Sequence, residues 1–126
     1  MADLGISLYI DDERPTPTGF THSAKTAAAA IAILEDARAH GAQMDLISFD
    51  HDLGDILVDG KIVDHNSRSV LWWVVENSFW PATMRFHTAN PVGHEWLLGT
   101  ARNFAPETTE IDPTDPWAVK GFENYG

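Results

Sequence analysis

Two kinds of segment alternate along the chain: short apolar runs, and longer stretches in which apolar residues recur at helical spacing. The short runs have the length and the β-branched and aromatic content of buried strands. They predict strands over residues 5–10, 46–49 and 83–88. The longer stretches predict helices over residues 26–40, 70–75 and 91–104. Strands that alternate with helices predict an α/β domain with a mostly parallel sheet.

The segments between these elements give weaker signals. Prolines after the first strand predict a tight connection over residues 15–18, which leaves no room for a long helix. Residues 20–24 fit either a second short strand or a loop. Apolar residues around Asp59 and Gly60 predict a β-hairpin insertion over residues 56–63. We expect this hairpin to form a flap at the rim of a site.

The chain is most simply one domain, since it has 126 residues and no internal repeat. Residues 1–105 are predicted to form the α/β domain. Residues 106–126 are predicted to be an acidic, irregular extension packed on the same domain, with Trp117, Phe122 and Tyr125 as its apolar contacts.

Composition limits the possible functions. The chain has no cysteine, which excludes disulfides, thiolate metal sites and thiol nucleophiles. No apolar run approaches the ~20 residues of a membrane span, and the first residues lack the features of a signal peptide, so we expect a cytoplasmic protein. A formal net charge of −11 argues against binding to duplex DNA. A small phosphorylated ligand at a cation-neutralised pocket remains compatible with this charge.

Polar residues follow three of the predicted strands. Asp11 and Asp12 follow the first strand, Asp50 to Asp52 the next, and His87 and Asn90 lie at the end of the third. Parallel strands bring their carboxyl ends to one edge of the sheet, where ligands bind in open α/β folds. Carboxylates favour Mg²⁺ or Mn²⁺, and imidazole would shift the preference toward Mn²⁺ or Zn²⁺. We therefore predict a divalent metal held by the carboxylates of Asp11, Asp12 and Asp50, with Asp52 as a further candidate ligand. A solvated acidic turn is the alternative for any one of these segments.

Two further groups extend this site. The helix start from Asn90 to Gly93 offers backbone N–H groups to a phosphate, and Arg14 offers a bidentate donor. The alternative for Arg14 is a surface ion pair. His51 and His87 lie beside the other candidates, so either can serve as a general acid. The alternative for His87 is a buried imidazole satisfied by a backbone carbonyl.

Three blocks carry a family resemblance: L-Y-I-D-D-E-R-P from Leu8, D-L-I-S-F-D-H-D-L-G from Asp45, and H-T-A-N-P-V-G from His87. Together they resemble the cyclic-phosphate-processing receiver-like family over residues 6–105. The resemblance implies a flavodoxin-like sandwich related to the receiver domains of two-component signalling. It also places Asp11, Asp12 and Asp50 where receivers hold Mg²⁺. The family is associated with cyclic phosphates of nucleotides or RNA ends.

The sequence departs from the receiver pattern in two ways. The first receiver helix is missing, and neither a fifth strand nor the lysine that follows it is apparent, which weakens a phosphorelay role. We therefore predict a metal-dependent phosphodiester hydrolase acting on a cyclic phosphate of a small nucleotide or RNA end. The metal, held in part by Asp50, would polarise the phosphoryl oxygens and supply hydroxide. The alternative is a non-catalytic, degenerate receiver-like module for signalling or nucleotide binding.

Overall fold

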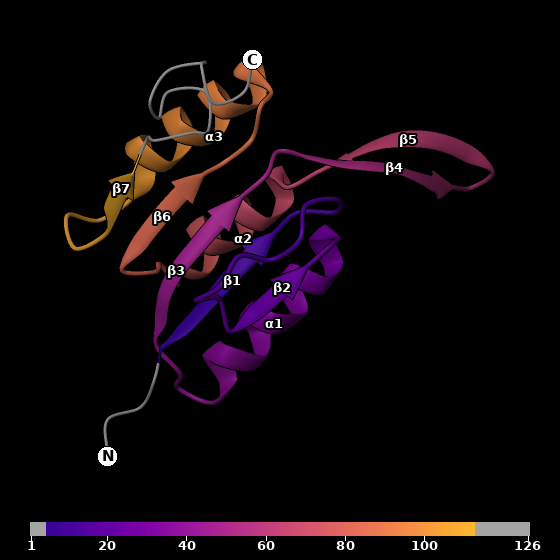
Figure 1. The fold of residues 1–126 in the computed structure, drawn as a ribbon. Helices are drawn as coiled ribbons and strands as arrows, with labels where there is room; N and C mark the ends of the chain where they lie inside the picture. Colours follow the sequence, from indigo (N-terminus) through magenta and orange to yellow (C-terminus); the bar gives the residue numbers. More distant parts are fainter. Residues whose placement is uncertain (1–4, 113–126) are drawn as a thin grey trace.

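The computed structural model describes residues 5–112 and contains a five-stranded parallel sheet in the order β2-β1-β3-β6-β7 (Figure 1). The strands are β1 (Ile6–Ile10), β2 (His22–Ala24), β3 (Met44–Phe49), β6 (Thr83–Phe86) and β7 (Glu110–Asp112). The described residues also form three helices: α1 (Ala27–Ala39) follows β2, α2 (Arg68–Asn77) lies between β3 and β6 in the sequence, and α3 (Pro91–Phe104) follows β6. No helix separates β1 from β2, as the prolines predicted. The arrangement is a flavodoxin-like α/β fold without the first receiver helix, which confirms the predicted fold class.

The core lies between the sheet and the helices. Helix α1 packs against α2, and α2 packs against α3, so the three form one layer. The strands direct alternate residues into this layer, and Leu8, Ile47 and Met84 are fully buried there. Their neighbours Ser7 and Leu46, which point to the other face, are only half-buried. The register of the sheet aligns the ends of the central strands, because Ile10 pairs with Phe49 and Phe49 pairs with Phe86.

The predicted hairpin is present and is longer than the sequence suggested. Strands β4 (Asp52–Val58) and β5 (Lys61–Asn66) form a separate antiparallel ribbon. Asp59 and Gly60 have φ values of 50° and 78°, as a two-residue hairpin turn of this hand requires. The ribbon projects away from the body in Figure 1, so its base rather than its tip borders the end of β3.

The structure settles one open alternative and corrects three expectations. Residues 20–24, which fitted either a strand or a loop, form a strand over His22–Ala24. Strand β6 ends at Phe86, so His87 lies just beyond it. Trp72 in α2 belongs to the apolar run over residues 70–75, which favours a place in the core, yet it is 40% exposed and contacts the rings of Trp96 and Phe104.

The third correction concerns the tail. It is not irregular throughout, because β7 adds a fifth strand parallel to β6. This short strand carries two acids and has no apolar alternation that would have indicated it. It ends in Asp112, an acid rather than the lysine of a receiver. Residues 113–126, with Trp117, Phe122 and Tyr125, lie outside the described residues, so their predicted packing stays a prediction. Within residues 5–112, no helix is long and apolar enough to cross a membrane.

Candidate functional site

Three carboxylates meet at the carboxyl ends of β1 and β3. Asp11 and Asp50 come directly after these strands, and the backbone N–H of Asp50 donates to the carbonyl of Ile10 at 2.9 Å. One carboxylate oxygen from each of Asp11, Asp12 and Asp50 lies within 4.8 Å of the other two. Asp11 and Asp50 are buried, and Asp12 is half-buried. Such a set of hard oxygen donors suits a divalent cation such as Mg²⁺ or Mn²⁺.

The carboxylate of Asp11 is held by four donors. Its Oδ1 accepts the backbone N–H groups of Glu13 and Arg14 at 2.8 and 2.9 Å. Its Oδ2 lies 2.8 Å from a guanidinium nitrogen of Arg14 and 3.0 Å from Nε2 of His87. Burial alone would raise the pKa of Asp11, but these hydrogen bonds lower it below its ordinary value. Asp11 is therefore ionised and fixed in one orientation.

The pKa of Asp50 is shifted in the opposite direction from that of Asp11. Burial, followed by the negative charge of Asp11, raises the pKa of Asp50 to about 6. The hydroxyl of Thr88 donates to its carboxylate and limits the rise. The same hydroxyl accepts the backbone N–H of Asn90 at 3.1 Å, so Thr88 joins the end of β6 to Asp50. A cation beside these acids would remove the repulsion that raises this pKa.

Arg14 is the nearest cation to the acids. One guanidinium nitrogen lies 2.8 Å from Asp11 Oδ2 and 3.7 Å from Asp50 Oδ2. The side chain is nevertheless 42% exposed, since it reaches the acids from the solvent side. Both alternatives considered for Arg14 are therefore compatible with its position: it forms an ion pair, and it lies where a phosphate bound at the acids would be in reach.

Both ring nitrogens of His87 have partners. Nε2 lies 3.0 Å from the Asp11 carboxylate, and Nδ1 lies 2.7 Å from the hydroxyl of Ser48. The ring stacks on Tyr9, with 4.4 Å between the ring centroids. Burial lowers the pKa of His87 to about 4, even though the bond to Asp11 favours the protonated form. His87 is thus neutral at pH 7, and its Nε2 proton is directed at Asp11 because that carboxylate can only accept.

His51 belongs to a different network. Its Nε2 accepts the Nε–H of Arg68 at 2.9 Å, so the ring carries its proton on Nδ1 when neutral. Nδ1 lies 2.9 Å from Asp52 Oδ1. The guanidinium of Arg68 also lies 4.6 Å from the ring centroid of Trp96. Because both nitrogens of His51 are occupied and the residue is buried, it ties α2 to the start of the hairpin.

Asp52 is not part of the carboxylate cluster, contrary to its candidacy as a metal ligand. It begins β4, its side chain is 61% exposed, and its two oxygens bind His51 and Asn90. Asp52 was a candidate because it lies two residues after Asp50 in the sequence, whereas in the structure its carboxylate is engaged by His51 and Asn90. Gly54 takes the position near the cluster, because a Cβ there would lie 3.0 Å from Asp12 Oδ2. Its φ of 81° is also one that glycine adopts readily.

The start of α3 does not present free N–H groups to a phosphate. Asn90 Oδ1 accepts the N–H groups of Val92 and Gly93 at 3.1 and 3.2 Å, as an N-cap does. Gly93 has another role: a Cβ on it would lie 2.3 Å from Cγ of His51, so only glycine lets α3 approach that ring. The predicted phosphate contacts of Asn90 and Gly93 would require this cap to open.

A cavity of about 320 Å³ adjoins Asp11 on the β2 side of the cluster. It is lined by residues from the β1–β2 connection and the end of β2: Asp11, Glu13, Arg14, Pro15, Thr16, Ser23 and Lys25. Lys25 was not among the sequence candidates, because β2 is too short to show that Lys25 follows a strand. Ser48 and Thr88 were also missed; a serine within an apolar strand was the available signal for the first.

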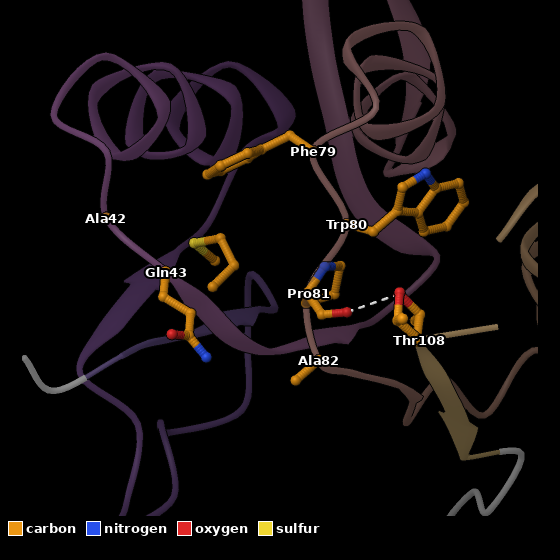
Figure 2. Close-up of a pocket in the computed structure, with 9 residues that line it drawn as sticks. Ala42, Gln43, Phe79, Trp80, Pro81, Ala82 and Thr108 are labelled. Carbon is orange, nitrogen blue, oxygen red and sulfur yellow. Dashed lines mark hydrogen bonds between the residues drawn. The ribbon is translucent and has the colours of Figure 1, made fainter. Parts of the chain in front are cut away.

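A second cavity, of about 310 Å³, lies at the amino-terminal ends of β3 and β6 (Figure 2). Phe79 and Trp80 border it, and the hydroxyl of Thr109 donates to the carbonyl of Pro81 at 2.8 Å across one side. None of the described residues that line it is charged. It is therefore unsuited to a phosphate and lies at the opposite edge of the sheet from the carboxylates.

Comparison with known proteins gives one match. A family model described as the cyclic-phosphate processing receiver domain matches residues 6–103. This match confirms the resemblance carried by the three sequence blocks. No curated protein and no solved structure gives a significant match.

Proposed function

Because this chain belongs to the cyclic-phosphate processing receiver domain family, we propose that it is a metal-dependent hydrolase that opens a cyclic phosphate on a small nucleotide or RNA end. The observation that carries this proposal is the cluster of Asp11, Asp12 and Asp50, whose oxygens lie within 4.8 Å of one another. Neither the family description nor the fold specifies hydrolysis, so the proposal depends on the chemistry of this cluster.

The donor set fits a divalent cation. Three carboxylates converge, two of them buried, and the charge of Asp11 helps to raise the pKa of Asp50 to about 6. Mg²⁺ or Mn²⁺ matches all-oxygen donors best, and Zn²⁺ is less favoured because both nearby imidazoles already have partners. When bound, such a cation would neutralise the acids and act as a Lewis acid toward a phosphoryl oxygen.

The residues around the cluster have distinct roles in this proposal. Arg14 reaches the cluster from solvent and binds the phosphate charge. His87 fixes the orientation of Asp11 through Nε2, and Ser48 holds the other ring nitrogen. We therefore assign His87 a positioning role, in place of the general acid predicted from its place in the sequence. His51 likewise positions the hairpin base, since neither of its nitrogens is available.

The net reaction is the addition of water across one P–O bond of the ring. The hydroxyl of water joins phosphorus, the bond to one ribose oxygen breaks, and that oxygen takes up the remaining proton. With neither imidazole free to donate, we propose that the departing oxygen receives its proton from water.

A screen of phosphodiesters tests the proposal. The full chain is incubated with cyclic and linear phosphodiesters in the presence of Mg²⁺, Mn²⁺ or Zn²⁺, and products are separated by chromatography. We expect ring opening of a cyclic phosphate that EDTA abolishes. Turnover of linear diesters alone, or activity that survives EDTA, would contradict the assignment. Asp50→Asn should abolish the ring opening, because it removes one of the clustered carboxylates. Asp55→Asn, in the hairpin, is the matched control and should retain it.

A second candidate, a phosphoacceptor module, is favoured by two observations. Strand β7 completes the five parallel strands that the sequence did not reveal, and Thr88 bonds Asp50 at the end of the central strand. In that case Asp50 would accept a phosphoryl group. Incubation with acetyl phosphate or beryllofluoride, read by intact mass or fluorine NMR, separates the two. A stable adduct on Asp50 would support signalling, and its absence together with turnover would support hydrolysis.

A further inference from the structure

The cavity beside Asp11 combines three features that bear on the substrate. It has a volume of about 320 Å³, near the lower end of the range for small-molecule sites. Its lining includes Asp11, a member of the carboxylate cluster, and Arg14, which contacts that cluster, so a ligand at the cluster can extend into the cavity. Two hydroxyl groups, from Thr16 and Ser23, also line it and can donate hydrogen bonds to an anionic ligand.

Lys25 is the distinctive residue of this cavity. The chain has 8 Lys+Arg against 19 Asp+Glu, yet two of the cations line this one space. Within residues 5–112, Lys25 forms no salt bridge, although acids outnumber bases more than twofold. It is also exposed at the end of β2, at the same edge of the sheet as the cluster. Among the described residues its ammonium group has no acidic partner, so it is available to a ligand in this cavity.

The charges of the cavity depend on the state of the cluster. Asp11 and Glu13 are negative, and Arg14 and Lys25 are positive, so the lining is balanced as it stands. Arg14 is engaged by Asp11 at 2.8 Å. A divalent cation at the cluster would offset most of the charge of its three carboxylates, which reduces the negative charge that opposes Arg14 and Lys25. The cavity then favours an anion.

We propose that this cavity binds a second phosphate of the substrate, distinct from the cyclic phosphate at the cluster. Lys25 is the main contact, and Arg14 lies between the two phosphates. The inference rests on the proposed function for the position of the first phosphate. It narrows the substrate class to nucleotides or short RNA ends that carry a terminal phosphate as well as a cyclic one.

A pair of probes tests the inference: adenosine 2′,3′-cyclic phosphate with and without a 5′-phosphate. Calorimetry with each probe, in Mg²⁺ and under conditions of no turnover, gives the preference for the 5′-phosphate as a ratio of Kd values. Lys25→Gln should reduce this ratio by about tenfold, the loss expected for one charge-assisted hydrogen bond at a partly exposed site. Glu13→Gln should increase the ratio, because it removes a negative charge from the lining of the cavity. Lys61→Gln, at the tip of the hairpin, is the control and should leave the ratio unchanged.

The outcomes separate this inference from the proposed function. A Lys25-dependent preference in calorimetry, together with no turnover of either probe in the phosphodiester screen described above, would support the subsite and count against hydrolysis. Turnover with equal affinity for the two probes, or with a preference that Lys25→Gln leaves intact, would overturn the subsite and leave hydrolysis standing. Tighter binding of the probe without a 5′-phosphate would also overturn it, since Glu13 would then dominate the cavity.

Discussion

Gly93 in α3 lies against the imidazole of His51, so closely that a Cβ on Gly93 would be 2.3 Å from Cγ of that ring. Two sequence blocks far apart in the chain, D-H-D-L-G and N-P-V-G, are thereby fitted to one another. The contact lets Asn90, three residues before Gly93, reach Asp52 with its side-chain amide at 3.0 Å. The start of α3, the base of the hairpin and the end of β3 are held together at this point, next to the carboxylate cluster.

This contact predicts that a methyl group added at Gly93 lowers the stability of the fold, whereas one added elsewhere in α3 does not. Gly93→Ala should lower the free energy of unfolding by about 1–3 kcal/mol, because the buried ring of His51 has to move. Gly99→Ala in the same helix has open space around its Cβ and should be neutral or stabilising by up to about 1 kcal/mol. Urea titrations of both variants measure the difference. Equal effects of the two substitutions would show that the His51 contact is not a constraint.

Repulsion between the acids predicts an unusual stability change at Asp50. In the absence of metal and above pH 6, Asp50→Asn should stabilise the protein by about 1–3 kcal/mol, because it removes a buried charge whose pKa is raised to about 6. The same variant should lose most of the rise in melting temperature that Mg²⁺ or Mn²⁺ produces in the parent chain. Asp55→Asn should do neither. Destabilisation by Asp50→Asn without metal would contradict this electrostatic account.

The two perturbed groups predict opposite slopes of stability with pH in the metal-free protein. His87 has a folded pKa of about 4, below its ordinary 6.5, so the unfolded chain binds its proton first and stability falls as pH drops from 6.5 toward 4. Asp50 has a folded pKa of about 6, above its ordinary 3.8, so stability falls as pH rises through that window. The slopes oppose each other in the parent chain.

Single variants should reveal each slope. Asp50→Asn should leave stability rising with pH between about 4 and 6.5, whereas His87→Asn should leave it falling between about 4 and 6. Denaturant midpoints measured in EDTA at several pH values give both slopes. Two variants with the same sign of slope would show that at least one of these groups titrates normally in the folded protein.

The position of Arg14 predicts that its removal changes the affinities for a divalent cation and for a phosphate in opposite directions. Its guanidinium lies 2.8 Å from Asp11 and 3.7 Å from Asp50, so it opposes a divalent cation at the same carboxylates. Arg14→Gln should therefore tighten Mn²⁺ binding several-fold in calorimetry and weaken binding of a cyclic phosphate. Arg102→Gln, near the end of α3, is a control and should change neither. Weaker Mn²⁺ binding in the Arg14 variant would mean that Arg14 organises the acids rather than competing for them.

The sequence was sufficient to predict which site residues meet at the carboxyl ends of the strands. Asp11, Asp12 and Asp50 follow apolar strands that had to be parallel, so their meeting at one edge followed from topology. Side-chain direction was not accessible in the same way. Asp52 begins a strand that the hairpin signal placed four residues later, and this strand directs its carboxylate toward Asn90.

Other features depend on contacts that have no local signature. Gly93 fits a helix start in the sequence, and only the packing of α3 on His51 shows why it is glycine. Strand β7 has three residues, two of them acidic, and exists because β6 offers it an edge. Lys25 follows a strand of similar length, so nothing in the sequence placed it beside Asp11.

The claim that the carboxylate cluster hydrolyses a cyclic phosphate is tested most directly by phosphorus NMR. Adenosine 2′,3′-cyclic phosphate bearing a 5′-phosphate is incubated with the full chain and Mn²⁺, in parallel with Asp50→Asn and with an EDTA control. We predict that the cyclic resonance is replaced by that of a monoester in the first sample and persists in the other two. Persistence of the cyclic resonance in all three samples, with Mg²⁺ and Zn²⁺ as well as with Mn²⁺, would contradict the proposed function.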